Sequence, residues 1–372
     1  MKMNDNSAMW ALGFMSGTSC DGVDAAMIYS DGHDIFEFGH TAFRPFNASD
    51  RAFLLELNNS LAQQGAILGY EEKIAAASCL ITNYHIELTR EILSQIPKDK
   101  WPQIIGFHGQ TLFHAPDKGV TLQVGYGSRL AQQTKIDVID QFRLNDVYNG
   151  GQGAPLAPIY HDALARMRFK GKISAFINIG GIANISLCQP NKPPIAFDTG
   201  PGNALMDQLM QKHQDKPYDT NGAFAREGKI IEHMLNSWLK DPYFTLPYPK
   251  SADRAQFNHC LNPTDISFQD HMRSLLEFTV KTIYDGLKQL DRPIDSLIVS
   301  GGGSKNSFLM DELEERLQCP ILKADDIGLR SDYIEAEAFA YLAIRHLKQL
   351  PLSFPTTTNV SEPLLGGKRH KA

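Results

Sequence analysis

Short apolar runs with partial alternation open the chain and predict β-strands. They occupy residues 10–17, 23–30 and 35–43 and are separated by turn residues such as Gly and Asp. Apolar residues at helical spacing follow over residues 50–64 and 69–96. Residues 101–111 then predict one more strand, which ends in a polar stretch. This part of the chain therefore predicts three strands, then helices, then a strand.

The same order of elements returns in the second part of the chain. Strands are predicted over residues 174–181, 183–189 and 193–200. A helix over 206–214 and a longer one over 271–290 come next, followed by a strand over 296–303 and a helix over 306–317. The two parts share no evident sequence identity, so the repeat is one of element order.

Two rounds of strands and helices indicate an α/β protein with two domains. The boundary is expected near residues 125–135, which gives an N-terminal domain 1–128 and a C-terminal domain 129–372. A last helix over about 334–350 is expected to pack back on the N-terminal domain. Ligands of α/β sheets bind beyond strand ends, and pockets favour clefts between domains.

Composition narrows the class of protein. The chain has 372 residues, 42% hydrophobic and 21% charged, which is enough apolar material for two cores. Its net charge of −6 gives no global basic field for nucleic acid, and the basic end, residues 368–371, is expected to be a solvated terminus. Five widely spaced cysteines show no zinc or disulfide pattern. No run approaches the roughly 20 apolar residues of a membrane span, so we expect a cytoplasmic protein with no membrane partner.

The segment GTSCDGVD, residues 17–24, interrupts two apolar strands with small, hydroxyl and acidic residues. Glycine lets a backbone approach phosphate oxygens closely, and Thr18 and Ser19 add hydroxyl donors. Asp21 and Asp24 repel phosphate unless a Mg²⁺ ion or its water shell lies between. An ordinary β-hairpin is the alternative, since Asp21-Gly22 is a good turn signal. The segment is not a Walker loop.

Three further stretches place glycines or an acid at strand ends. Gly180-Gly181 form either a phosphate cradle or a plain hairpin. Gly301, Gly302 and Gly303 join a strand to a helix and suit a flat ligand group, although the spacing GxGxxG is absent. Asp198 ends an apolar strand, where a carboxylate can serve as general base or form a turn. The five small or turn residues after it, residues 199–203, favour a functional role.

Three isolated polar residues are also candidates. His108 follows an apparent strand and is flanked by glycines. Arg143 can hold a carboxylate with two parallel hydrogen bonds. Glu335 begins the last helix, where an acid alone would be read as a partner of the helix dipole.

Taken together, these motifs resemble the anhydro-N-acetylmuramic acid kinase family of the sugar kinase/Hsp70/actin superfamily. The similar runs, in family order, are GFMSGTSCDGVDAA, FHGQTLFHAP, TLQVG, GGQGAPLAP, NIGGIANIS, FDTGPGNALMD, PKS, GGGSKN and EAEAFAYLA. The resemblance implies two actin-like (ribonuclease H-like) domains around a central ATP and sugar cleft. It also implies a homodimer.

The resemblance further implies a reaction and its residues. ATP, water and 1,6-anhydro-N-acetylmuramic acid would give ADP and N-acetylmuramic acid 6-phosphate in peptidoglycan recycling. Asp198 would activate the water, Asp21 would lie at a Mg²⁺ ion, and the sugar would meet His108, Arg143 and Glu335. The implied ATP-binding residues are Gly17, Thr18, Ser19, Cys20, Asp21, Gly22, Val23, Asp24, Gly180, Gly181, Gly301, Gly302, Gly303 and Asn306.

Two other functions stay open at this point. One is a related kinase that phosphorylates a free hydroxyl or carboxylate, and the other is a non-catalytic ATP-binding switch. The chain departs from the family pattern in QFRLND around Arg143, in PKSADRA at residues 249–255 and in Tyr148-Asn149. These departures bear on sugar contacts and leave the proposed base and phosphate loops intact.

Overall fold

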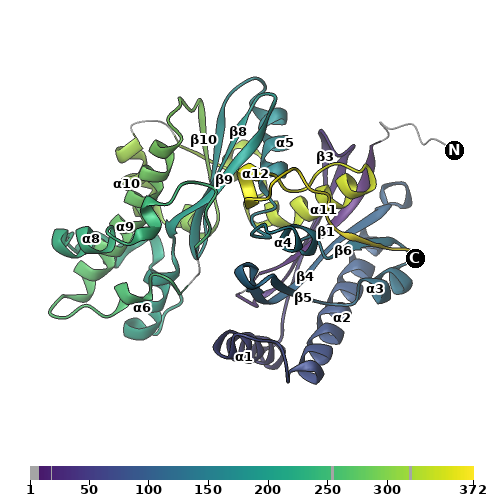
Figure 1. The fold of residues 1–372 in the computed structure, drawn as a ribbon, viewed down its shortest axis with the longest axis horizontal. Coiled ribbons are helices and arrows are strands. Elements are labelled where there is room, and N and C mark those ends of the chain that lie inside the picture. Colours follow the sequence, from purple (N-terminus) through teal and green to yellow (C-terminus); the bar gives the residue numbers. More distant parts are fainter. Residues whose placement is uncertain (1–7, 18, 253–254, 318–320) are drawn as a thin grey trace. The chain divides into compact units, whose positions relative to one another are not determined.

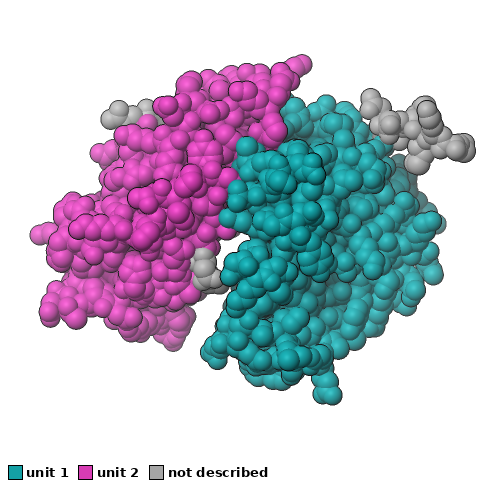
Figure 2. All heavy atoms as spheres, viewed as in Figure 1, with its two compact units in different colours: residues 1–167, 332–372 teal, residues 168–331 magenta. Residues whose placement is uncertain are grey.

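The chain folds into two compact units, shown as a ribbon in Figure 1 and in separate colours in Figure 2. A computed structural model describes residues 8–17, 19–252, 255–317 and 321–372. Unit 1 comprises residues 1–167 and 332–372, and unit 2 comprises residues 168–331. The division therefore falls after residue 167, and not near residue 128, because strand β6 (Asp137–Asp140) pairs with β4 (Ile104–Ala115) of unit 1.

Unit 1 is built on one mixed sheet with the strand order β12-β6-β4-β1-β2-β3 and with β5 paired to β4. β1, β2 and β3 form an antiparallel meander, and β4 runs parallel to both β1 and β6. The remaining strand bounds are β1 Met9–Ser16, β2 Gly22–Ser30, β3 Ile35–Pro45, β5 Val120–Val124 and β12 Lys368–His370. The first three strands are those that the apolar runs predicted.

Helices of unit 1 pack on this sheet, and the last long helix lies directly against its centre. The helices are α1 Ala48–Gln64, α2 Glu71–Gln95, α3 Gly127–Thr134, α4 Leu144–Tyr148, α5 Pro158–Arg168, α11 Ile334–Leu347 and α12 Pro355–Thr358. Helix α11 contacts β1, β2 and β4. A Cβ atom on Gly13 would lie 1.9 Å from the Ala336 carbonyl oxygen, and one on Gly106 would lie 2.0 Å from that of Phe339. These two glycines therefore permit the close approach of α11.

Unit 2 repeats the arrangement with the strand order β11-β10-β7-β8-β9. Its strands are β7 Ser174–Ile179, β8 Ile182–Gln189, β9 Lys192–Pro201, β10 Ser296–Ser300 and β11 Ile321–Lys323. Its helices are α6 Ala204–Gln214, α7 Ala223–Glu227, α8 Glu232–Trp238, α9 Phe268–Gln289 and α10 Ser307–Leu317. The amphipathic helix α9 packs on β8 and β9 and on the helices around it.

The two sheets share one topology. In each, an antiparallel three-stranded meander is extended, beside its first strand, by two strands parallel to it. This is the strand order of a ribonuclease H-like domain, so the predicted α/β class with two actin-like domains is confirmed. Within the described residues, no helix is both long and apolar enough to cross a membrane.

The C-terminal residues form part of the sheet. Strand β12 pairs antiparallel with β6. The Arg369 guanidinium donates to the Asp137 carboxylate at 2.5 and 2.8 Å, and the His370 ring lies 2.9 Å from the Asp140 carboxylate. Lys368, Arg369 and Lys371 are exposed, as expected of a solvated basic terminus, and two of the basic side chains, Arg369 and His370, also contact acids on β6.

Candidate active site

The turn between β1 and β2 is fixed by side chains of the sheet below it. The Ser16 hydroxyl donates to the Gly22 carbonyl at 3.1 Å and also hydrogen-bonds the Gln110 carboxamide oxygen. The Gln110 amide nitrogen in turn donates to the Gly17 carbonyl at 2.9 Å. The backbone carbonyls of Gly17 and Gly22 are thus held by side chains of β4 and β1. Ser16 was not among the predicted site residues, since its role depends on the distant Gln110.

Members of the predicted phosphate segment have different surroundings. The Ser19 hydroxyl donates to Asp21 at 3.0 Å, and both side chains are exposed. The Cys20 thiol is buried, and burial raises its pKa to about 11, so it remains neutral at physiological pH. Val23 belongs to the apolar core and can offer only its backbone to a ligand. Thr18 lies outside the described residues.

Carboxylates gather near the start of β2 in unit 1. Burial raises the pKa of Asp24 to about 7, and the negative charges of Asp21, Glu335 and Asp332 add to this effect. Glu335 stays accessible to solvent, yet desolvation by surrounding protein raises its pKa too, and Arg143 opposes the increase. In the part of the chain that the structure describes, no three acidic, His or Cys side chains lie close enough to form a metal cage. One or two carboxylates, completed by phosphate and water, suit Mg²⁺ instead.

Arg143 and His108 lie together in unit 1. Arg143 follows β6, and its Nε and Nη2 atoms lie 3.1 and 3.0 Å from Nε2 of His108 on β4. Its Nη1 donates to the Gly153 carbonyl at 2.7 Å, and the guanidinium lies 5.9 Å from the centre of the Phe339 ring. Burial lowers the pKa of Arg143 to about 10, while Glu335 and Asp146 raise it. The guanidinium therefore stays charged. It hydrogen-bonds His108 and interacts electrostatically with Glu335, so the three predicted sugar-site residues are coupled.

The glycine-rich turns of unit 2 lie together at the carboxyl ends of its strands β7, β9 and β10. β7, β9 and β10 run in the same direction, so Gly181, Gly202 and Gly301 follow carboxyl ends on the same side. The Gly202 N–H donates to the Gly181 carbonyl at 2.9 Å, and the Asn203 amide donates to the Ile179 carbonyl at 3.2 Å. The structure thus brings together three motifs that lie between residues 180 and 303 of the sequence.

Close backbone contacts explain several of these glycines. A Cβ atom on Gly202 would lie 2.2 Å from the Gly180 carbonyl oxygen. Gly301 has φ 81°, and a Cβ atom there would lie 2.4 Å from the Asn178 carboxamide oxygen. By contrast, Gly302 has room for a methyl group, with its nearest neighbour at 3.6 Å. Asn306 caps α10, since its carboxamide oxygen accepts from the Leu309 N–H at 3.2 Å.

Asp198 lies near the end of β9 with one carboxylate oxygen fixed. Its Oδ2 accepts from the Ala252 N–H at 2.9 Å, and no partner of Oδ1 is found among the described residues. Burial raises the pKa of Asp198 to about 6, and the Ala252 hydrogen bond opposes this increase. The group is therefore ionised at neutral pH, and among the described residues one of its oxygens has no partner; these are the requirements for a general base.

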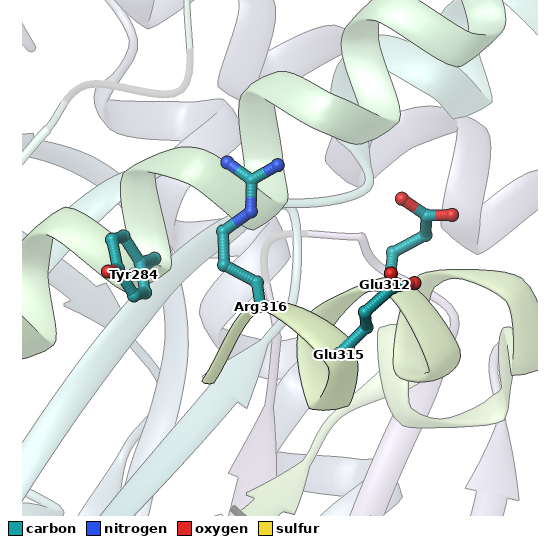
Figure 3. A pocket seen from close by; sticks show the side chains of 4 residues that line it. All are labelled: Tyr284, Glu312, Glu315 and Arg316. Carbon is teal, nitrogen blue, oxygen red and sulfur yellow. The ribbon is translucent and has the colours of Figure 1, made fainter. Parts of the chain in front are cut away.

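A surface hollow of unit 2 lies apart from all these residues. It has a volume of about 410 Å³ and is lined by Tyr284, Glu312, Glu315 and Arg316, as Figure 3 shows. Arg316 pairs with the buried Glu277 at 2.5 Å, and Glu312 pairs with Arg273 at 2.6 Å. These ion pairs connect α9 to α10. The charged residues that line the hollow therefore stabilise the packing of these two helices.

Two ribonuclease H-like units with glycine-rich and acidic strand ends define a protein of the sugar kinase/Hsp70/actin class. The family model for anhydro-N-acetylmuramic acid kinase matches residues 9–371. A protein of that name from Methylobacterium nodulans is 41% identical and is matched over 96% of this chain and 99% of its own length. Another from Azorhizobium caulinodans is 40% identical, over 96% and 98%. The chain belongs to the anhydro-N-acetylmuramic acid kinase family, and membership of a kinase family supports the use of ATP.

Solved structures give more distant matches. Component A of (R)-2-hydroxyglutaryl-CoA dehydratase from Acidaminococcus fermentans has a TM-score of 0.43 at 12% identity, covering 91% of this chain and 98% of its own. A ROK hexokinase from Thermus thermophilus has a TM-score of 0.40 at 12% identity, covering 92% and 100%. Since both scores are below 0.5, the family assignment rests on the sequence matches.

Proposed function

We propose that the protein hydrolytically opens 1,6-anhydro-N-acetylmuramic acid and phosphorylates its O6, giving N-acetylmuramic acid 6-phosphate and ADP. The observation that carries this proposal is Asp198, a strand-end carboxylate of the family motif FDTGPGN. One of its oxygens is fixed by Ala252, and the other has no partner among the described residues. O6 of this sugar is tied up in the anhydro bridge. A base that activates water is therefore needed before any hydroxyl exists to receive phosphate.

The proposed reaction begins with water and ends with transfer of the γ-phosphoryl group to O6. Asp198 takes a proton from water, and the water oxygen forms a bond to the anomeric carbon. The bond between C1 and O6 breaks, and O6 attacks the γ-phosphorus of ATP, which releases ADP. General base catalysis contributes about 10²- to 10⁴-fold, and in-line positioning of O6 supplies much of the rest.

Phosphate binding is proposed for two sets of backbone groups. In unit 1 the set is residues 17–24, of which residues 22–24 begin β2, and in unit 2 it is Gly180-Gly181, which follow β7. Gly301, Gly302 and Gly303, with Asn306, are proposed to lie near the nucleoside. Asp21 would hold Mg²⁺ with phosphate and water, and the ion, when bound, would neutralise charge on the phosphates.

Sugar recognition is proposed for the cluster in unit 1. N-acetylmuramic acid carries a carboxylate, and the half-buried, charged guanidinium of Arg143 suits such a group. Glu335 can accept hydrogen bonds from sugar hydroxyls, and His108 holds Arg143. The amino sugar is the proposed small-molecule partner, in the cytoplasm and in peptidoglycan recycling. No nucleic-acid partner is proposed, and a homodimer remains a prediction from the family.

An ADP-release assay in ¹⁸O-labelled water tests the function. With ATP, Mg²⁺ and the anhydro sugar, we expect ADP and a 6-phosphate that carries one ¹⁸O at the anomeric carbon, read before exchange with solvent. No ADP above background would contradict the proposal. Faster turnover of a sugar with a free 6-hydroxyl would instead favour a kinase that deprotonates its acceptor directly.

A further inference from the structure

A single segment outside the sheet, residues 243–252, makes three hydrogen bonds to Asp198. The Asp198 N–H donates to the Lys250 carbonyl at 2.9 Å. The Tyr243 hydroxyl donates to the Asp198 carbonyl at 2.6 Å, and the Ala252 N–H donates to Oδ2 at 2.9 Å. The backbone on both sides of the Asp198 side chain, and one carboxylate oxygen, are thus fixed by residues about 50 positions away in sequence.

The segment that holds Asp198 is itself well anchored. Tyr243 is only 4% exposed and packs edge-on against Phe257, with the ring centres 5.8 Å apart. The Lys250 ammonium is buried, donates to the Tyr243 carbonyl at 3.1 Å and lies 4.7 Å from the centre of its ring. The ring of Tyr248 stacks on Phe197, the residue before Asp198. Tyr243 and Lys250 therefore have little freedom to move.

We propose that Tyr243 and the backbone N–H of Ala252 are positioning groups for the general base, fixing Asp198 so that Oδ2 is occupied and Oδ1 faces the water to be activated. This inference rests on the proposed function. A catalytic group must be held within a fraction of an ångström of its working geometry, and supporting hydrogen bonds provide that restraint.

Among the described residues, few titratable groups face Asp198. The Tyr243 phenol is one, and it stays neutral because burial raises its pKa. Lys250 turns its ammonium to the Tyr243 ring and carbonyl and makes no ion pair with Asp198 among the described residues. The balance between burial and the Ala252 hydrogen bond therefore sets the charge state of Asp198. Loss of that hydrogen bond is expected to raise the pKa of Asp198 further.

The first test compares two tyrosine variants. Tyr243→Phe keeps the ring and removes the hydroxyl, and we expect kcat to fall roughly tenfold while KM for the sugar changes less than about twofold. Tyr341→Phe is the matched control, since its buried hydroxyl also donates to a backbone carbonyl, that of His33 at 2.8 Å. Equal kcat values for Tyr243→Phe and the wild type would overturn the proposal.

The second test follows Asp198 directly, without turnover. Carboxyl resonances of ¹³C-aspartate-labelled protein are titrated, with Asp198→Asn used to assign the signal. Ala252→Pro removes the N–H and is expected to raise the pKa of Asp198, whereas Ala252→Gly keeps the N–H and leaves it unchanged. An identical pKa in the two variants would overturn the role of Ala252, and should Ala252→Pro not fold, the tyrosine pair decides. Absence of wild-type turnover, by contrast, would reject the proposed function while the titration still reports on positioning.

Discussion

Arg143 directs two of its nitrogens at the same ring nitrogen of His108, Nε at 3.1 Å and Nη2 at 3.0 Å from Nε2. A guanidinium only donates, so Nε2 accepts and the ring proton lies on Nδ1, which donates to the Gly109 carbonyl at 2.8 Å. Burial and the Arg143 charge hold the pKa of His108 well below its usual value. His108 is therefore a neutral support for Arg143, with both ring nitrogens occupied by protein groups.

Replacement of His108 by Phe should weaken sugar binding through Arg143. The ring contact with Phe339 is retained, but the guanidinium loses its acceptor, so we expect KM for the sugar to rise roughly tenfold and stability to fall by about 1–3 kcal/mol. Steady-state kinetics and urea unfolding measure the two effects. His108→Gln, which can still accept, should recover part of the loss, and His40→Phe on β3 should leave KM unchanged. An unaltered KM in His108→Phe would contradict a contact between Arg143 and the sugar.

The pH dependence of turnover should report Asp198. Because its pKa is raised to about 6, the base is protonated below that pH, and kcat should fall about tenfold per pH unit on the acid side. Measurement of kcat from pH 4.5 to 9 at saturating sugar and ATP tests this expectation. A profile that stays flat down to pH 5 would argue against Asp198 as the base.

Replacement of Asp198 by Asn should abolish turnover and stabilise the fold at high pH. The folded-state pKa lies above the ordinary value of 3.8, so ionisation disfavours the folded state as pH rises from about 4 to 6. Removal of the charge should raise the free energy of unfolding by up to about 3 kcal/mol at pH 8 and by almost nothing near pH 4. Urea unfolding at both pH values measures the difference.

Replacement of Asp270 by Asn is expected to change the stability at pH 8 in the opposite direction to Asp198→Asn, so a comparison of the two variants tests the cause of each pKa shift. Hydrogen bonds from Lys229 and Ser267 lower the pKa of Asp270, so its charge favours the folded state above its ordinary pKa. Asp270→Asn should therefore lose stability at pH 8. Equal behaviour of the two variants would show that burial of Asp198 is not the cause of its raised pKa.

Local sequence patterns predicted most strands and helices, and they placed Asp198 and the glycine turns at strand ends. Hydrophobic periodicity is a local property of the sequence, so it predicts individual strands and helices well. The extent of unit 1 did not follow from it, because β6 has only four residues. The return of the last helix to unit 1 was expected, and α11 indeed packs on β1, β2 and β4. Its packing depends on Gly13 and Gly106, which read locally as ordinary strand glycines.

The contacts that orient the candidate site residues could not be predicted from local sequence patterns either. Ser16 meets Gln110 across 94 residues, and Tyr243 meets Asp198 across 45. Neither pair has a periodic or spacing signature, since each depends on two strands or a strand and a loop being brought together in the fold. The contacts of Arg369 and His370 were missed for the same reason, as their partner acids lie on β6.

Removal of residues 368–372 should destabilise unit 1. The truncation removes the β12 ladder, the Arg369–Asp137 pair and the His370–Asp140 contact, and it leaves β6 as an unpaired edge. We expect a loss of about 1–3 kcal/mol in the free energy of unfolding, measured by urea titration. Arg369→Ala alone should cost less than about 1 kcal/mol, since that pair is partly exposed. An unchanged stability of the truncated chain would show that β12 adds nothing to the fold.

Two neighbouring glycines should separate structural from ligand-binding roles. A Cβ atom on Gly303 would lie 2.3 Å from the Ile179 side chain, so Gly303→Ala should lower stability by about 1–3 kcal/mol. At Gly302 the nearest atom, the Asn203 amide nitrogen, lies 3.6 Å away, so Gly302→Ala should fold with near wild-type stability. If the nucleoside lies against this backbone as proposed, the added methyl group should nevertheless weaken ATP binding at least roughly tenfold, a loss of about 1.4 kcal/mol. Isothermal titration with a non-hydrolysable ATP analogue, beside thermal unfolding of both variants, distinguishes the two effects. Wild-type affinity in Gly302→Ala would move the nucleoside away from this turn, because no structural rearrangement would be available to hide the clash.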